Sequence, residues 1–173
     1  MQTIFRTFAW QKHALSLVLA PLAGMLIAAD SPAFAAPTAT PPAGCTGPAS
    51  KVWIKVVVQN VRSKDGLIAI TLYADNSSRF LAHHGALYVG FTPAVAGTTE
   101  TCIFLPRTGV YALAIYHDAN SNKKFDRNSL GLPAEGYGFS NNAPTLLGLP
   151  AFRQVRMSML RNGMTTHIAL KYP

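Results

Sequence analysis

The sequence lacks a hydrophobic run long enough to span a membrane. Its longest apolar stretch, residues 14–29, holds about sixteen residues and is interrupted by Pro21, whereas a spanning helix needs roughly twenty. Basic residues precede this stretch and the small-x-small sequence at 33–35 (AFA) follows it, an order typical of a secretory signal peptide. We therefore predict that residues 1–35 are a signal peptide, that the protein is periplasmic or secreted, and that no transmembrane span is left after cleavage.

The sequence also lacks a dense basic run. Lysine and arginine outnumber aspartate and glutamate 15 to 7, which gives a net charge of +8, but no two basic residues are adjacent except Lys123 and Lys124. Nucleic-acid-binding domains concentrate such residues on one face, so we predict no nucleic-acid partner. A diffuse positive field favours loose contact with anionic lipids and glycans, and we predict an envelope glycan or protein as the partner.

Cysteine is scarce, with Cys45 and Cys102 as the whole complement. Export places thiols in an oxidising compartment, so we predict a disulfide between them, which stabilises the fold by roughly 4 kcal/mol in the chain-entropy model. The alternative is a lipid anchor on Cys45, because residues 42–45 (PAGC) resemble a bacterial lipobox.

Residues 36–50 form a lead that is rich in Pro and Ala, a composition typical of an extended linker. After this lead, the sequence shows no helical periodicity. The domain at 51–173 instead shows short runs of β-branched and alternating apolar residues. We predict hairpins at Asp65-Gly66 and Asn162-Gly163. The predicted strands are 51–61, 66–74, 86–91, 98–105, 110–117, 152–160 and 165–172.

Residues 76–84 interrupt the strand pattern, and their Asn-Ser-Ser opening predicts a single capped helical turn with Phe80 and Leu81 facing inward. Short strands and tight turns together favour an all-β fold, an antiparallel β-sandwich of about seven strands of immunoglobulin-like or transthyretin-like type, with a small barrel as the alternative. About thirty residues from 118 to 149 carry no strand signal. Compact domains rarely hold such a long polar loop without a function for it, so we take it as the candidate site.

The loop and its flanks resemble the bacterial "domain of unknown function 2141" family over roughly residues 54 to 172. The family pattern has glycine about where Lys123 stands. The resemblance implies an exported β-sandwich domain and carries no known activity. The residues that carry it are 111–118 (YALAIYHD), Asn120, Asn122, 125–126 (FD), 131–133 (GLP) and 135–142 (EGYGFSNN).

Oxygen-bearing residues recur at every second position at the start of this loop, in the order of an EF-hand calcium loop. The helices of an EF-hand are missing, and Ser129 stands where its bidentate glutamate belongs, so Glu135 is the candidate for that carboxylate. We interpret the pattern as a calcium site, and the alternative is a set of turns built by side-chain to backbone hydrogen bonds. The candidate ligands are Asp118, Asn120, Asn122, the carbonyl of Lys124, Asp126 and Glu135.

Two other functions fit the same loop. In the first, Tyr137 and Phe139 present aromatic faces to a sugar ring or a peptide, and Asn141 and Asn142 add hydrogen bonds. In the second, an envelope hydrolase uses Asp126 and Glu135 as acid and base. No Gly-x-Ser-x-Gly nucleophile elbow occurs in the sequence. We predict a non-enzymatic accessory or binding domain with no catalytic residues, and the hydrolase is the alternative.

Overall fold

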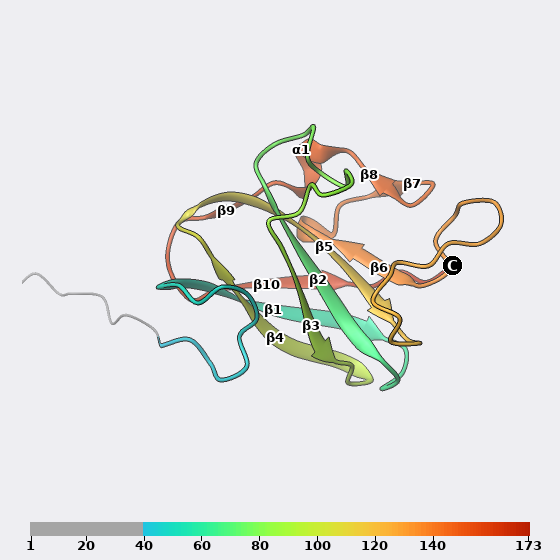
Figure 1. Ribbon diagram of the computed structural model, residues 1–173, viewed down its shortest axis with the longest axis horizontal. Helices are drawn as coiled ribbons and strands as arrows, with labels where there is room; N and C mark the ends of the chain where they lie inside the picture. The colour runs from blue at the N-terminus through green and yellow to red at the C-terminus, as the bar shows by residue number, and fades with distance from the viewer. Residues whose placement is uncertain (1–39) are drawn as a thin grey trace, which may run out of the picture. The chain divides into compact units, whose positions relative to one another are not determined.

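The structure is a computed structural model that describes residues 40–173, and the predicted signal peptide at 1–35 lies outside them. The described residues form two facing β-sheets (Figure 1), so the predicted all-β class is confirmed. The first sheet has the strand order β10 (Met164–Ala169), β1 (Val52–Val61) and β4 (Gly97–Leu105). The second has the order β3 (Tyr88–Pro93), β2 (Leu67–Ala74), β5 (Gly109–Asp118) and β6 (Gly136–Phe139), and β9 (Met157–Met159) also pairs with β5. Between β6 and β9 lie the 3₁₀ turn η1 (Ser140–Asn142), the hairpin of β7 (Thr145–Leu146) and β8 (Leu149–Pro150), and helix α1 (Phe152–Val155). Among residues 40–173 no helix is both long and apolar enough to cross a membrane.

The core between the two sheets is built from apolar side chains that alternate along the strands. On β2, the side chains of Ile68, Ile70 and Leu72 are at most 1% exposed and belong to one buried cluster with the inward residues of β1, β4, β5 and β10. Ile168 and Leu170 near the C-terminus join the same cluster. The predicted inward faces of both segments are therefore confirmed, but Ala69, Thr71 and Tyr73 on the other face of β2 are buried as well, so β2 is covered on both sides.

Both predicted hairpins are wrong, because the strands on either side of each turn belong to different sheets. The Asp65-Gly66 turn leads from β1 to β2, and these strands pair with other neighbours. The Asn162-Gly163 turn packs on β1 instead, where Trp53 donates its N–H to the Asn162 side chain at 2.9 Å. A turn motif sets where the chain reverses, but the choice of neighbouring strand depends on which apolar faces meet.

One pairing in the first sheet is parallel. Strand β1 lies between β4, which runs antiparallel to it, and β10, which runs parallel to it from Ile54 opposite Met164 to Gln59 opposite Ala169. The first and last long strands of the domain are therefore direct neighbours (Figure 1). The sandwich departs in this sheet from the fully antiparallel arrangement that we predicted.

The outer face of the second sheet is covered by a smaller cluster of its own. Tyr73 and Phe139 belong to it, and the Phe80 ring contacts both, with ring centroids 5.1 and 6.1 Å apart. Phe80 is held by the predicted turn, where its N–H donates to the Asn76 carbonyl at 3.2 Å. Leu81 does not face inward: its φ of 56° ends the turn and leaves it 39% exposed.

The segment predicted as a strand at 152–160 is divided between α1 and β9. Residues 152–155 form one helical turn, and pairing with β5 begins at Met157 opposite Tyr111. Val155, Met157 and Met159 are nevertheless buried as the alternation predicted. The apolar spacing was therefore correct, and the local backbone conformation was not.

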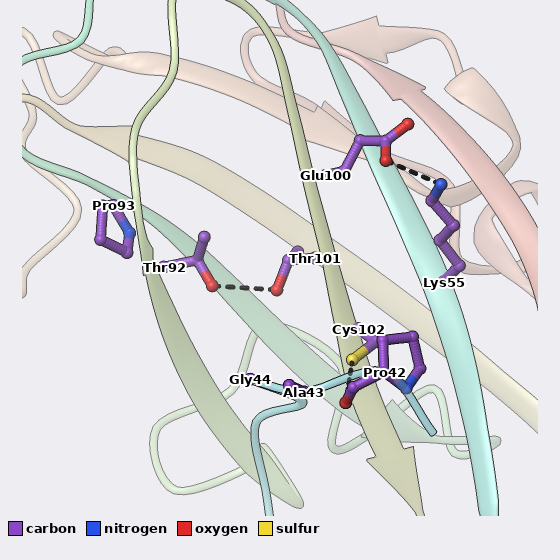
Figure 2. Close-up of a pocket in the computed structure, with 9 residues that line it drawn as sticks. All are labelled: Pro42, Ala43, Gly44, Lys55, Thr92, Pro93, Glu100, Thr101 and Cys102. Carbon is purple, nitrogen blue, oxygen red and sulfur yellow. Dashed lines mark hydrogen bonds and ion pairs between the residues drawn. The ribbon is translucent and has the colours of Figure 1, made fainter. Parts of the chain in front are cut away.

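The described part of the lead, residues 40–50, lies along the edge of β4. Thr46 forms a parallel bridge with Ile103, and the predicted disulfide joins Cys45 to Cys102. Figure 2 shows Cys102 and the carbonyl of Pro42 facing the space beside β4. Edge strands expose unpaired backbone groups that favour aggregation, so the lead protects this edge in addition to being tied to it.

Candidate functional site

Asp118 closes the polar loop that follows β5. Its carboxylate is fully buried and accepts the backbone N–H groups of Asn122 at 3.0 Å and Lys123 at 2.8 Å. Lys123 has a φ of 59°, in the left-handed region that glycine occupies without steric penalty. The loop thus makes the tight turn for which the family pattern has glycine, with a lysine in its place.

Asp126 is the central acceptor of the loop. Its Oδ2 atom accepts hydrogen bonds from the side-chain amides of Asn120 and Asn122, both at 2.8 Å. The amide oxygens of these two asparagines accept backbone N–H groups, that of Asn122 from Lys124 at 2.7 Å. The predicted side chains therefore converge, and they do so through the Asx turns that we held as the alternative to a metal site.

Glu135 completes this cluster from the start of β6. Its Oε2 accepts the Asp126 N–H at 3.1 Å, and the residue is only 9% exposed. Burial raises the pKa of the Glu135 carboxyl and the nearby charges of Asp126 and Asp118 raise it further, against the backbone N–H groups of Asp126 and Ala119, which lower it. The Glu135 carboxyl group thus lies within reach of the negative charges of Asp126 and Asp118.

In the structure, these carboxyl groups accept hydrogen bonds from N–H groups. Within residues 40–173, no three His, Cys, Asp or Glu side chains are grouped so as to hold a metal ion. The amide nitrogens of Asn120 and Asn122 face Asp126, and rotation of these amides would turn their oxygens toward it instead. A calcium ion at this point needs that rotation.

A shallow aromatic groove crosses the outer face of the second sheet. The strand register places Phe91 of β3, Ala69 of β2, Tyr116 of β5 and Tyr137 of β6 in one row across the sheet. Two adjoining cavities, of about 340 and 440 Å³, share Tyr116 and the neighbouring floor residue Thr71. The small residue Ala69 on β2 separates Phe91 on one side from Tyr116 and Tyr137 on the other side of this row.

The polar loop supplies one wall of this groove. Phe125 packs against Tyr116 and Tyr137, with ring centroids 5.4 and 6.1 Å apart. The Arg127 guanidinium lies 5.1 Å from the centre of the Phe125 ring, and the Lys123 ammonium lies 5.7 Å from that of Phe91, both at cation–π distance. The Asx turns therefore position an aromatic ring and two cations at the groove.

Tyr116 is the titratable group at the centre of the floor. Burial, followed by the negative charges of Asp118, Glu135 and Asp126, raises the pKa of its hydroxyl to about 12. The hydroxyl is therefore protonated at any physiological pH and is available as a hydrogen-bond donor. No carboxylate lines either cavity, whereas Arg127 and Lys123 do.

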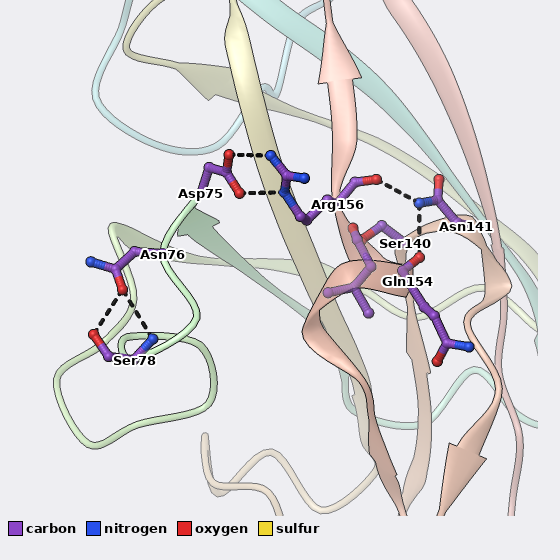
Figure 3. A network of polar contacts seen from close by, with 8 residues as sticks. Asp75, Asn76, Ser78, Ser140, Asn141, Gln154 and Arg156 are labelled. Carbon is purple, nitrogen blue, oxygen red and sulfur yellow. Dashed lines mark hydrogen bonds and ion pairs between the residues drawn. The ribbon is translucent and has the colours of Figure 1, made fainter.

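Of the four residues predicted to bind a ligand, two line the groove and two do not. Tyr137 and Phe139 lie in its wall. Asn141 donates from its side-chain amide to the carbonyl oxygens of Gln154 and Arg156 at 3.0 and 2.8 Å (Figure 3). Asn142 accepts the Ala169 N–H at 2.8 Å. These two asparagines hold η1 against α1 and β10, and we leave them out of the ligand site.

The contacts of the two carboxyl groups assigned to the alternative hydrolase hold the loop together. Asp126 accepts two amide donors, Glu135 accepts the Asp126 N–H, and neither lines the groove.

His117, buried at the end of β5, has both ring nitrogens engaged, with the Tyr172 hydroxyl at 2.7 Å and the Asp65 carbonyl at 2.8 Å.

Sequence reasoning missed most of the groove. Phe91, Tyr116, Phe125 and Arg127 line it, and none was a candidate ligand residue. Phe91 and Tyr116 gave a signal as aromatic residues on predicted strands, whereas Phe125 and Arg127 lie in the loop. The groove can be recognised from these residues only when the register that aligns β3, β2, β5 and β6 is known.

The fold and site together define an all-β sandwich domain with an Asx-rich loop and an aromatic groove. The chain belongs to the family described as uncharacterized protein conserved in bacteria (DUF2141), whose model matches residues 56–168. The expected family is thus confirmed, and the matched region contains both the loop and the groove. Neither the curated proteins nor the solved structures contain a significant match to this chain.

Proposed function

We propose that this chain is an exported, periplasmic or secreted, non-enzymatic binding domain, and that the aromatic groove is its ligand site. The observation that carries the proposal is the row of Phe91, Tyr116 and Tyr137 across one sheet face, enclosed by Phe125 from the loop. Ligand sites combine apolar walls with a few placed polar groups. Export is supported by the N-terminal sequence and by the disulfide, which is typical of oxidising compartments.

The ligand that this groove suits is an envelope glycan. A sugar ring has a flat apolar side that stacks on aromatic faces such as those of Tyr137 and Phe125, and hydroxyl groups that need partners. Tyr116 provides a donor that stays protonated, and Arg127 provides a charged donor at the wall. The two cavities adjoin across the sheet, which favours a chain of sugar units over a single ring.

The second part of the proposal is that a bound calcium ion orders the polar loop. Its support is the EF-hand-like spacing, the left-handed Lys123, and the repulsion that the charges of Asp126 and Asp118 exert on the Glu135 carboxylate. A dication relieves that repulsion, because it favours the charged form of each carboxyl group. The proposed ion would therefore fix the wall that carries Phe125 and Arg127.

The ligand site is tested by calorimetric titration with neutral and uronic-acid oligosaccharides of three to six units. We expect Phe125→Ala to weaken binding at least tenfold. The matched control is Phe104→Ala, which removes a half-buried ring from β4 on the other sheet. Equal binding by the two variants would exclude the groove, and turnover of any oligosaccharide, lost in Asp126→Asn, would favour the hydrolase.

The calcium site is tested by thermal unfolding with 2 mM calcium and then with chelator. We expect the midpoint to rise with calcium, and the rise to be absent in Asp126→Asn. The control is Asp65→Asn, which removes an exposed carboxylate outside the cluster. A midpoint that calcium leaves unchanged would remove the ion from the proposal and leave the groove untouched.

A further inference from the structure

The same five residues, Leu-Gly-Leu-Pro-Ala, occur twice in the chain, at 130–134 and at 147–151. In both copies the glycine adopts a left-handed backbone, with φ of 76° at Gly131 and 81° at Gly148. The leucine before each glycine stands at the apex of a turn and is exposed, Leu130 by 81% and Leu147 by 72%. The chain therefore presents two leucine-tipped turns of the same sequence.

Both turns are rigidly built. In the first, the Asn128 side-chain oxygen accepts the N–H groups of Leu130 and Leu132, each at 3.0 Å. In the second, Leu147 and Gly148 form the two-residue turn between β7 and β8, and both have positive φ, as in a type I′ turn. Leucine rarely adopts this conformation, for which asparagine and glycine are the usual residues. An apolar side chain is thus held at the apex against the preference of the backbone.

The two turns lie side by side. The ring of Pro133 in the first turn packs so closely on Gly148 in the second that a Cβ there would overlap it. Arg127 reaches both, since it donates to the Gly131 carbonyl at 2.8 Å and lines the same cavity as Gly148 and Leu149. A guanidinium group therefore lies beside two exposed leucine tips.

We propose that this pair of turns, with Arg127, docks the domain onto an anionic lipid surface. Two separate leucine tips, rather than a flat contiguous patch, suit insertion between lipid headgroups, and a basic group beside them suits lipid phosphate. The net charge of +8 acts in the same direction. Leu146, 80% exposed in the same hairpin, adds to the apolar area. The inference shares Arg127 and Gly148 with the groove wall, but it requires no ligand in the groove.

The first experiment measures co-sedimentation of the full chain with vesicles of phosphatidylcholine alone and with 30% phosphatidylglycerol. We expect Leu130→Asn with Leu147→Asn to weaken binding to the anionic vesicles by about tenfold per leucine. Leu147→Asn suits the left-handed backbone, so the thermal midpoint should not fall. The matched control is Leu160→Asn, which removes a leucine 78% exposed outside both turns. All variants keep the same residues 1–39, so any contribution from that segment cancels.

The second experiment is local. The parent chain already holds Trp10 and Trp53, so the emission of each variant is compared with that of the parent. Leu147→Trp should add a blue shift on anionic vesicles and quenching by lipids brominated on the acyl chain, whereas Leu160→Trp should add neither effect. Arg127→Gln should reduce the preference for anionic vesicles about fivefold, and Arg127→Lys should keep most of it. Equal sedimentation of the Leu130/Leu147 and Leu160 variants, or an unquenched Leu147→Trp, would overturn the proposal. Self-association through the leucine tips without vesicles would also overturn it, in favour of a protein interface.

Discussion

The carboxyl group of Glu135 accepts the backbone N–H of Asp126 at 3.1 Å, nine residues earlier in the chain. This contact joins the start of β6 to the middle of the polar loop. It places an acceptor next to a second carboxyl group, so the same contact that closes the loop also brings like charges together. The stability of the loop should therefore depend on pH and on the charge of this one side chain.

Glu135→Gln should raise the thermal midpoint of the calcium-free protein at pH 8. The pKa of Glu135 in the folded protein is raised, chiefly by burial. Protonation of Glu135 therefore contributes stability that is fully present below the pKa of the unfolded chain, near 4.3. This contribution is lost as the pH rises through the pKa of the folded protein. Glutamine removes that loss and keeps an acceptor for the Asp126 N–H. The gain should shrink at pH 4, and the same variant should lose any response to calcium. A lower midpoint at pH 8 would contradict this electrostatic account.

Ser140→Ala should lower the free energy of unfolding by about 1 to 3 kcal/mol. The Ser140 hydroxyl accepts the Leu113 N–H at 3.0 Å and donates to the Val155 carbonyl, and the residue is fully buried. Alanine leaves the Leu113 donor without this partner in an apolar setting. Urea unfolding measures the change, and Ser158→Ala on the exposed side of β9 serves as the control, with an expected change near zero.

Asn141→Ala should lower stability by about 1 to 2 kcal/mol, because it removes two hydrogen bonds and puts alanine in a left-handed backbone at φ 61°. Asn141→Gly should lose less, since glycine accepts that backbone freely. Neither variant should change oligosaccharide binding. Weakened binding with unchanged stability would return Asn141 to the ligand site.

Replacing Cys45 and Cys102 together with alanine should lower the free energy of unfolding by about 4 kcal/mol, as expected for a crosslink between residues 57 apart. Guanidinium unfolding of the oxidised protein, the reduced protein and the double variant measures this. The reduced protein should resemble the double variant. Identical midpoints for all three samples would show that the lead contributes nothing to stability.

The sequence predicted features that depend on local spacing. The apolar residues Ile68, Ile70, Met157, Met159 and Ile168 are buried as their alternation predicted, and Asp118 and Asp126 each accept a hydrogen bond from Asn122 within the predicted loop. Features that depend on distant neighbours were not predictable. The partner of β1 is the parallel β10, and the groove exists because register aligns Phe91 with Tyr116 across β2. Neither relationship leaves a signal within one stretch of sequence.

The parallel pairing of β1 with β10 also bears on when the domain can form. Strand β1 has β4 on one side, but its other side stays open until residues 164–169 are available. A chain that emerges from a ribosome or a translocation channel from its N-terminus onward cannot complete the first sheet until residues 164–169 are free. A truncation before Met164 would therefore leave one side of β1 permanently unpaired.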